Sequence, residues 1–185
     1  MRLAARVGRA PARARLILAL ACASLAPALA GQAIEIASSE GYAEALVPSS
    51  GWRQAVVGRQ LPEGSVLTTW IGARATMDYQ GNSLELGSLG RLKIEALEPE
   101  SVRLTLTEGS LTIRAASSAF EVEYRGARIS VREGEIALSD GVLSVVEGKA
   151  SVEGYSAAPL EIVAGGRLAL LDRATGPVFK GDRRR

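Results

Sequence analysis

The chain has 185 residues, with 22 Lys and Arg against 20 Asp and Glu, a single Cys and no His. This length suits one domain. The lack of His removes the usual general base for a Ser or Thr nucleophile, and a single Cys excludes an internal disulfide. Neither a phosphate-binding loop nor a dinucleotide fingerprint is present. We therefore expect a protein that is not an enzyme and that holds no metal or cofactor.

The first 30 residues are typical of a removable secretion signal. Five Arg residues precede or begin a short apolar run, Leu16–Leu25, and Ala28–Ala30 forms a small-residue cleavage site. The run is too short to span a bilayer as a stable helix. We predict cleavage between Ala30 and Gly31, a periplasmic or secreted mature protein, and no membrane span after cleavage.

Removal of this leader changes the charge of the protein. The five Arg residues leave without any acidic residue, so the net charge falls from +2 to −3. The basic pI of the whole chain therefore gives no reason to expect nucleic-acid binding. A second interpretation of the leader stays open, because Ala19–Cys22 resembles a lipoprotein cleavage box, which would make Cys22 a lipid anchor in the envelope.

The rest of the chain alternates apolar and polar side chains. Between Ala73 and Tyr79 every second residue is apolar, as in a half-buried antiparallel strand. Similar short runs occur at Ile34–Ile36, Leu84–Leu86, Leu92–Ile94, Phe120–Tyr124, Leu160–Ile162 and Leu168–Leu170. The pattern predicts an all-β domain over residues 31–171, built from about a dozen short strands. A basic, flexible tail is expected over residues 172–185.

The dipeptide Glu-Gly punctuates these runs. Three copies stand between alternating apolar residues in the stretch Val102–Val152. Because glycine readily adopts a positive φ, we interpret each copy as two short strands joined by a tight Glu-Gly reversal. The uneven spacing of the copies favours a twisted β-solenoid-like stack of strand pairs, with a β-sandwich or jelly roll as the alternative. The six Glu-Gly pairs of the chain begin at Glu40, Glu63, Glu108, Glu133, Glu147 and Glu153.

Turn glycines and apolar strands follow one another in a fixed order at Trp52, Gly58, Leu61–Thr69, Gly72–Ala75, Gly81–Leu86, Leu92–Ile94, Leu106–Leu111, Phe120–Val122 and Val145–Val152. This order resembles a FecR-type domain over residues 34–171. The resemblance implies a stand-alone, extracytoplasmic, all-β module that binds another envelope component. We expect it to lack the anti-sigma and transmembrane segments of the best-known members. It departs from the family at Val131–Ile136, where Val-Arg-Gly-Thr-x-Phe is frequent.

Two aromatic residues and two carboxylates are candidate site residues. Trp70 and Trp52 are candidate ligand-binding residues that could stack on a carbohydrate or a peptide, or else serve as core anchors. Glu121 and Glu123 share one face of a predicted strand, roughly 7 Å apart, a separation used in glycoside hydrolysis. The apolar residues between them favour the simpler interpretation of a solvated strand face.

These features predict a non-catalytic, FecR-like binding or scaffolding module that engages an envelope protein. Exposed strand edges could provide the contact by pairing with a strand of the partner. The alternative is an envelope protein that binds or processes glycan through Trp70 and the face carrying Glu121 and Glu123. The pattern indicates no particular oligomeric state.

Overall fold

The computed structural model describes residues 32–154, 156 and 158–170, and these residues form strands and turns without a helix. The all-β prediction is confirmed. The predicted leader and basic tail lie outside the described residues. The strands are β1 (Ala33–Glu40), β2 (Ala43–Val47), β3 (Gly51–Gln54), β4 (Gln60–Pro62), β5 (Val66–Thr69), β6 (Arg74–Tyr79), β7 (Asn82–Leu86), β8 (Arg91–Glu98), β9 (Ser101–Glu108), β10 (Leu111–Ala115), β11 (Ala119–Tyr124), β12 (Ala127–Ser139), β13 (Val142–Glu153), β14 (Leu160–Val163) and β15 (Arg167–Ala169).

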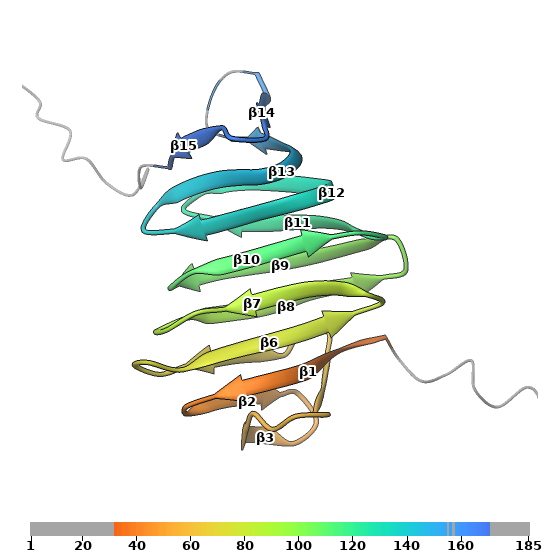
Figure 1. Ribbon diagram of the computed structural model, residues 1–185. Coiled ribbons are helices and arrows are strands. Elements are labelled where there is room, and N and C mark those ends of the chain that lie inside the picture. Colours follow the sequence, from red (N-terminus) through yellow and green to blue (C-terminus); the bar gives the residue numbers. More distant parts are fainter. Residues whose placement is uncertain (1–31, 155, 157, 171–185) are drawn as a thin grey trace, which may run out of the picture. The chain divides into compact units, whose positions relative to one another are not determined.

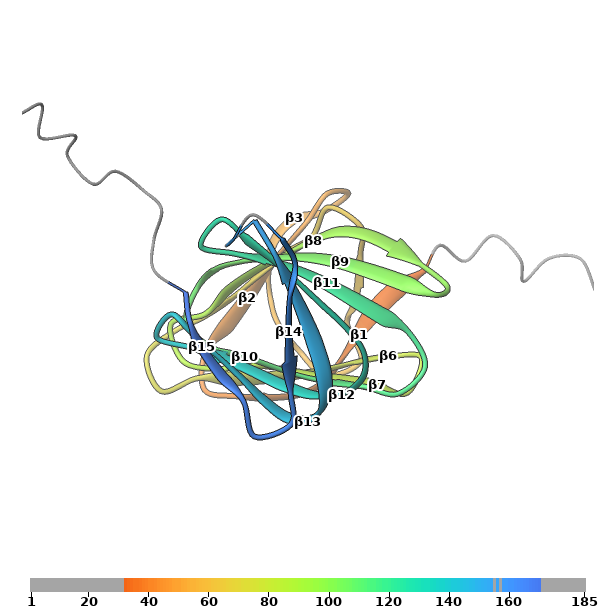
Figure 2. The ribbon, with the colours of Figure 1, turned by 90° about the horizontal axis from the view of Figure 1, so that it is seen from above.

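All 15 strands belong to one sheet that folds back on itself into two layers (Figure 1 and Figure 2). The back layer has the order β3-β2-β5-β8-β9-β11, and the front layer has the order β10-β7-β6-β1-β4. The 13-residue strand β12 joins the layers, because residues 127–131 pair with β11 and residues 134–138 pair with β10. β13 pairs with β12, and β14 and β15 pair with the two halves of β13. The described chain is therefore a stack of strands that bend from one layer into the other.

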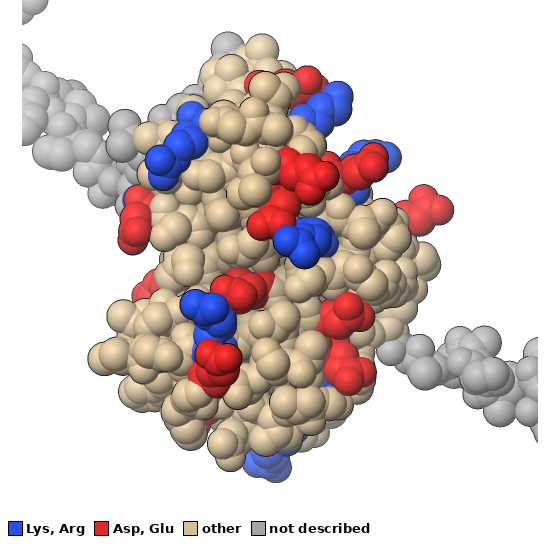
Figure 3. Space-filling model, in the orientation of Figure 1, with Lys and Arg blue, Asp and Glu red and all other residues tan. Residues whose placement is uncertain are grey.

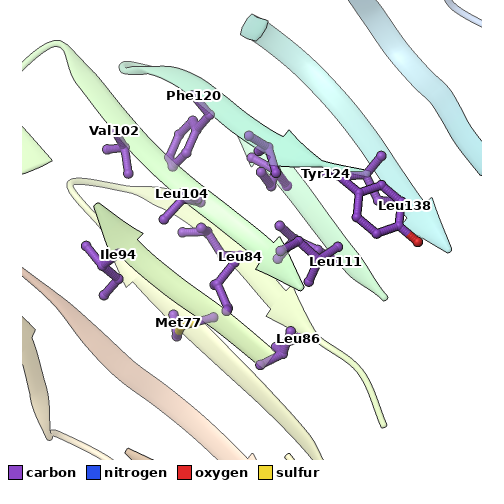
Figure 4. Packing of buried hydrophobic residues seen from close by; sticks show 14 of the residues in the cluster. Met77, Leu84, Leu86, Ile94, Val102, Leu104, Leu111, Phe120, Tyr124 and Leu138 are labelled. Atoms are coloured by element: carbon purple, nitrogen blue, oxygen red, sulfur yellow. The ribbon is translucent and has the colours of Figure 1, made fainter. Parts of the chain in front are cut away.

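Apolar side chains fill the space between the two layers. In β6 the residues Ala75, Met77 and Tyr79 are buried, as the alternation predicts, whereas Arg74 and Asp78 are exposed. Figure 4 shows the inward-facing side chains of neighbouring strands packed together, from Met77 on β6 to Phe120 on β11. Full burial of one such side chain stabilises the fold by about 1.5–3 kcal/mol. Burial of the alternating apolar side chains is therefore the main contribution to the stability of the fold.

Most of the Glu-Gly pairs are corners between the layers, so the interpretation of each pair as a tight reversal within a strand pair is wrong. Glu153-Gly154 differs, because it lies at the end of β13, ahead of β14, and β14 pairs with β13. Glu40-Gly41 connects β1 to β2, and these strands pair with other strands and not with each other. Glu108-Gly109 connects β9 of the back layer to β10 of the front layer in the same way. A corner needs a positive φ just as a hairpin does, and φ is +72° at Gly41 and +80° at Gly109. A Glu-Gly pair therefore has the same sequence pattern whether it forms a corner between layers or a hairpin between paired strands.

Three tight hairpins of the sheet use a different dipeptide, whereas Pro99-Glu100 closes the hairpin between β8 and β9 without a glycine. Gln80-Gly81 connects β6 to β7, Arg125-Gly126 connects β11 to β12, and Asp140-Gly141 connects β12 to β13. Both residues of each pair have a positive φ, which is the geometry of the two-residue type I′ turn that suits the twist of paired strands. A non-glycine residue followed by glycine therefore marks these three hairpins as well as the corners.

Two Glu-Gly corners lie directly against each other in the long strands β12 and β13. Gly134 is the register partner of Gly148. A Cβ atom at Gly134 would lie 2.2 Å from the carbonyl oxygen of Glu147, and one at Gly148 would lie 2.2 Å from the carbonyl oxygen of Glu133. The two strands therefore bend together only because neither residue has a side chain.

We predict that Gly134→Ala lowers the free energy of unfolding by about 3 kcal/mol or more, because the methyl group meets backbone and φ is +121°. The matched control is Gly165→Ala, also at a corner. There φ is +80° and no atom lies within 4 Å of the added Cβ, so only the conformational cost of about 1 kcal/mol is expected. Urea denaturation of the two variants measures the difference, and equal losses would contradict the close contact.

Asn82 holds together two turns at one edge of the stack. Its side chain is buried, and its Oδ1 accepts hydrogen bonds from the backbone N–H groups of Ala116, Ser117 and Ser118 at 2.7, 3.0 and 3.4 Å. Its Nδ2 donates to the carbonyl oxygen of Tyr79 at 2.7 Å. These bonds tie the hairpin between β6 and β7 to the segment that crosses from β10 to β11.

We expect Asn82→Ala to destabilise the fold by about 2–3 kcal/mol, since it leaves buried backbone groups without partners. Ser83→Ala, at the next residue with an outward-facing side chain, is the control and should change stability by less than about 0.5 kcal/mol. Thermal unfolding followed by circular dichroism gives both values. A small effect of Asn82→Ala would mean that solvent replaces the lost bonds.

Candidate binding surfaces

Trp70 lies in an exposed apolar patch at one edge of the stack. It follows β5, at the corner that leads into β6, and its backbone N–H donates to the carbonyl oxygen of Tyr42 at 3.0 Å. The Trp70 and Tyr42 rings meet edge to face, with centroids 6.0 Å apart. We define the tip patch as the four exposed residues Tyr42 (48% exposed), Trp70 (53%), Ile71 (83%) and Leu89 (55%).

Two neighbouring corners hold the tip patch in place. The backbone N–H of Leu89, in the corner from β7 to β8, donates to the carbonyl oxygen of Trp70 at 3.4 Å, and that of Gly72 donates to Ser88 Oγ at 2.9 Å. Behind them the buried Thr69 Oγ1 accepts a hydrogen bond from the Gly90 N–H at 2.8 Å. Leu89 has a φ of +55°, which is uncommon for a leucine. The patch is therefore built on fixed backbone and includes one strained residue.

Trp52 lies on the same outer face of the back layer as Trp70. It is 45% exposed on β3 and is the register partner of Leu46 on β2. Val66, the partner of Leu46 on β5, stands four residues before Trp70 in the sequence. The two Trp residues are therefore separated by roughly 13 Å along the strands. Neither Trp is a core anchor, so both are available for contact.

Glu121 and Glu123 lie higher on the back layer, away from Trp70. Their strand, β11, is three strands from β5 in the sheet order, and its Phe120, Val122 and Tyr124 are buried on the opposite face. Both carboxylates line a groove of about 360 Å³, together with Glu95, Arg103, Leu104, Thr105 and Arg128. Trp70 does not line this groove. The structure therefore does not bring Trp70 and the two glutamates into one site.

The charges around this groove compensate one another. Arg128 lies 4.0 Å from carboxylate oxygens of both Glu121 and Glu153, and Lys93 Nζ lies 2.8 Å from Glu95 Oε2. The hydrogen bond from Lys93 and a second one from Thr105 Oγ1 at 2.9 Å lower the pKa of Glu95 below its ordinary value. A lowered folded-state pKa stabilises the fold above the unfolded pKa, and that contribution is lost as the pH falls through the folded pKa.

Lys93→Met is expected to raise the pKa of Glu95 towards its ordinary value, because the principal donor to the carboxylate is removed. Carboxyl-carbon NMR titration measures this pKa directly. Arg91→Met, which removes the preceding outward-facing cation on β8, serves as the control and should leave the Glu95 titration where it is. Equal shifts in both variants would indicate a general charge effect in place of the specific contact.

A second groove, of about 570 Å³, lies where β12 and β13 bend. Its floor includes Gly134, Gly148, Ala150 and the hydroxyl-bearing residues Ser130 and Ser151. Charged side chains form its rim, and one opposed pair, Lys149 and Glu161, makes a hydrogen-bonded ion pair at 3.2 Å. The complete charged rim is Arg132, Glu133, Glu147, Lys149 and Glu161.

Clustered metal ligands, large charged surface areas and membrane-spanning helices are three other features by which the described part of the chain could indicate a function. There, no group of three or more His, Cys, Asp or Glu side chains is placed to hold a metal ion. Acidic and basic side chains are interspersed over the face seen in Figure 3 and form no large area of one sign. Across residues 32–154, 156 and 158–170, no helix is long and apolar enough to cross a membrane. The predicted cleavage site at Ala30 and Gly31 and the alternative anchor Cys22 lie outside these residues.

Comparisons with known proteins give a partial likeness of fold. No protein-family model and no curated protein matches the chain. Two crystal structures of a proposed anti-sigma factor from Parabacteroides distasonis match with a TM-score of 0.47, at 16% and 15% identity. Each match covers 55% of this chain and 52% of the other, so the likeness spans about half of each protein. The FecR-type resemblance stays a prediction from the motif residues.

Proposed function

We propose that the chain is a non-catalytic, FecR-like binding module of the cell envelope that engages a protein partner. The leader-like first 30 residues and the order of the FecR-type motifs support this assignment. The lack of His and the compensated charges around Glu121 and Glu123 favour binding over catalysis. The observation that carries the proposal is an open strand at the end of the sheet.

That open strand is β3. It pairs only with β2, and the N–H of Ala55, just beyond its end, donates to the carbonyl oxygen of Ala43 at 2.8 Å. Backbone groups alternate in direction along a strand, so the N–H groups of Trp52 and Gln54 point away from β2. Neither has a partner in the described part of the chain. An extended segment of a partner can therefore pair with this edge.

Exposed apolar side chains surround the same edge. Trp52 projects from β3, and Val56 and Val57 in the following turn are 44% and 64% exposed. Native proteins usually blunt an open sheet edge with charge or proline, because it invites association. Tryptophan is also enriched among the residues that contribute most binding energy at protein interfaces. Together these features favour a partner strand anchored by Trp52.

Glycan binding is the second candidate, favoured by the position of Trp52 and Trp70 on one outer face of the back layer. Aromatic faces separated along a flat sheet can stack on successive sugar rings. The separation of Trp70 from Glu121 and Glu123 gives no support to the idea that these residues process glycan together. The same experiment distinguishes a protein partner from a glycan partner.

A photo-crosslinking amino acid placed at Gln54 should give a discrete protein adduct in the native envelope. In the same protein, Val57→Ser should reduce the adduct at least threefold, since it removes an exposed apolar contact. The matched control carries the crosslinker at Thr76, on the outer face of the front layer, and should give no such adduct. Adducts of equal yield at both positions, or an adduct that contains only glycan, would contradict the proposed partner.

Gln54→Pro provides a second test in a chain that carries the crosslinker at Val57. Proline removes the N–H that points away from β2 and leaves the bonds between β2 and β3 in place. Capture through position 57 should fall at least tenfold while the melting temperature changes little. Unchanged capture would mean that the partner does not pair with the β3 edge.

A further inference from the structure

Beyond the proposed protein contact, we propose that the tip patch inserts into the surface of a lipid bilayer. The patch consists of Tyr42, Trp70, Ile71 and Leu89, on the outer side of the adjacent corners β1–β2, β5–β6 and β7–β8. It is separate from the β3 edge. The module would therefore lie against a membrane at one edge of its stack and offer its terminal strand to a partner.

The aliphatic side chains of the patch project into solvent from the corners of the stack. Ile71 and Leu89 belong to the neighbouring corners β5–β6 and β7–β8, at the edge drawn on the left in Figure 1. Ile71 is the most exposed large hydrophobic residue of the described chain, at 83%. Neither of the two grooves described above includes any residue of the patch. Projecting aliphatic side chains need no matching pocket in a fluid hydrocarbon layer, whereas a protein interface needs shape complementarity.

Two aromatic rings accompany the aliphatic residues in the patch. Trp70 and Tyr42 contact each other edge to face, and the Tyr42 hydroxyl donates to Glu44 Oε1 at 2.6 Å, back over the sheet. Trp and Tyr collect at membrane–water boundaries, where an apolar ring meets a polar layer. The patch thus combines aliphatic side chains with two amphipathic rings.

The charges near the patch indicate which lipid it should prefer. Arg74 lies 3.4 Å from Glu85, and Arg91 is the register partner of Glu108. Glu40 is the register partner of Arg74, and Glu44 accepts the Tyr42 hydroxyl. Carboxylates therefore outnumber the cations around the patch. Insertion should depend on apolar contact, so a zwitterionic surface should bind at least as well as an anionic one.

The strain at Leu89 supports a functional role for this residue. A leucine with a φ of +55° and a largely exposed side chain gains little from burial and loses conformational energy. A glycine would fit the same backbone without that strain. Leu89 thus has a side chain that the fold does not need, at the position where a lipid surface would use it.

The test uses the full chain, which has only two Trp residues. With Trp52→Phe, the fluorescence of Trp70 alone reports whether the patch enters lipid, whatever other segments do. Vesicles of phosphatidylcholine and phosphatidylethanolamine should shift this emission to shorter wavelength, and brominated lipids should quench it. The complementary variant, Trp70→Phe, leaves only Trp52, whose emission the same vesicles should not change.

Ile71→Ser combined with Leu89→Gly should weaken this vesicle binding at least tenfold. Both residues are exposed, and the glycine relieves the strain at position 89, so the variant should fold normally. Val57→Ser, at an exposed apolar residue outside the patch, should leave the vesicle binding unchanged. Unchanged Trp70 emission at saturating lipid would overturn the proposal. Vesicle binding that requires anionic lipid would also overturn it, and so would a change in Trp70 emission that occurs only when a protein partner is bound.

Discussion

Close approach of the backbone at the corners is the constraint on which this fold depends. The two layers share one core, so the chain must turn from layer to layer while neighbouring turns stay at the spacing of paired strands. At Gly134 and Gly148 this leaves no room for even a methyl group, because carbonyl oxygens of the adjacent strand occupy the space. Glycine at these points lets β12 and β13 bend together, and the bend places the inward-facing side chains of both halves in the same core.

Local features of the strands could be predicted from the sequence, but their arrangement between layers could not. The alternation from Ala73 to Tyr79 identifies β6 and its buried face correctly. In contrast, Glu40-Gly41 has the same sequence pattern whether it closes a hairpin or turns a corner, since both need a positive φ. The choice depends on which distant strands pair with β1 and β2, and no local pattern contains that information.

The candidate surfaces were identified only in part for the same reason. The sequence singles out Trp52 and Trp70, but only the register of β3, β2 and β5 reveals that they share one outer face. Whether Trp70 lies beside Glu121 and Glu123 depends on the order of distant strands in the sheet. Three strand positions separate β5, which precedes Trp70, from β11, which carries the two glutamates. Ile71 and Leu89 gave no signal of their own, because isolated apolar residues beside glycine are common in turns. A leucine directly before Gly90, in a run rich in turn residues, is the one sequence feature that could have indicated an exposed apolar corner.

The pairing of β9 with β11 has a consequence for how the protein reaches its native state. It is the only parallel pairing among the described strands, and the chain must pass through β10 in the other layer before β11 can form it. The other pairings of the described strands are antiparallel, and several join strands connected by short hairpins, which close within microseconds. Parallel pairing across such an excursion raises contact order and slows folding. The β9–β11 pairing should therefore be among the last contacts to form, together with the β10–β12 pairing that joins the same two parts of the stack in the front layer.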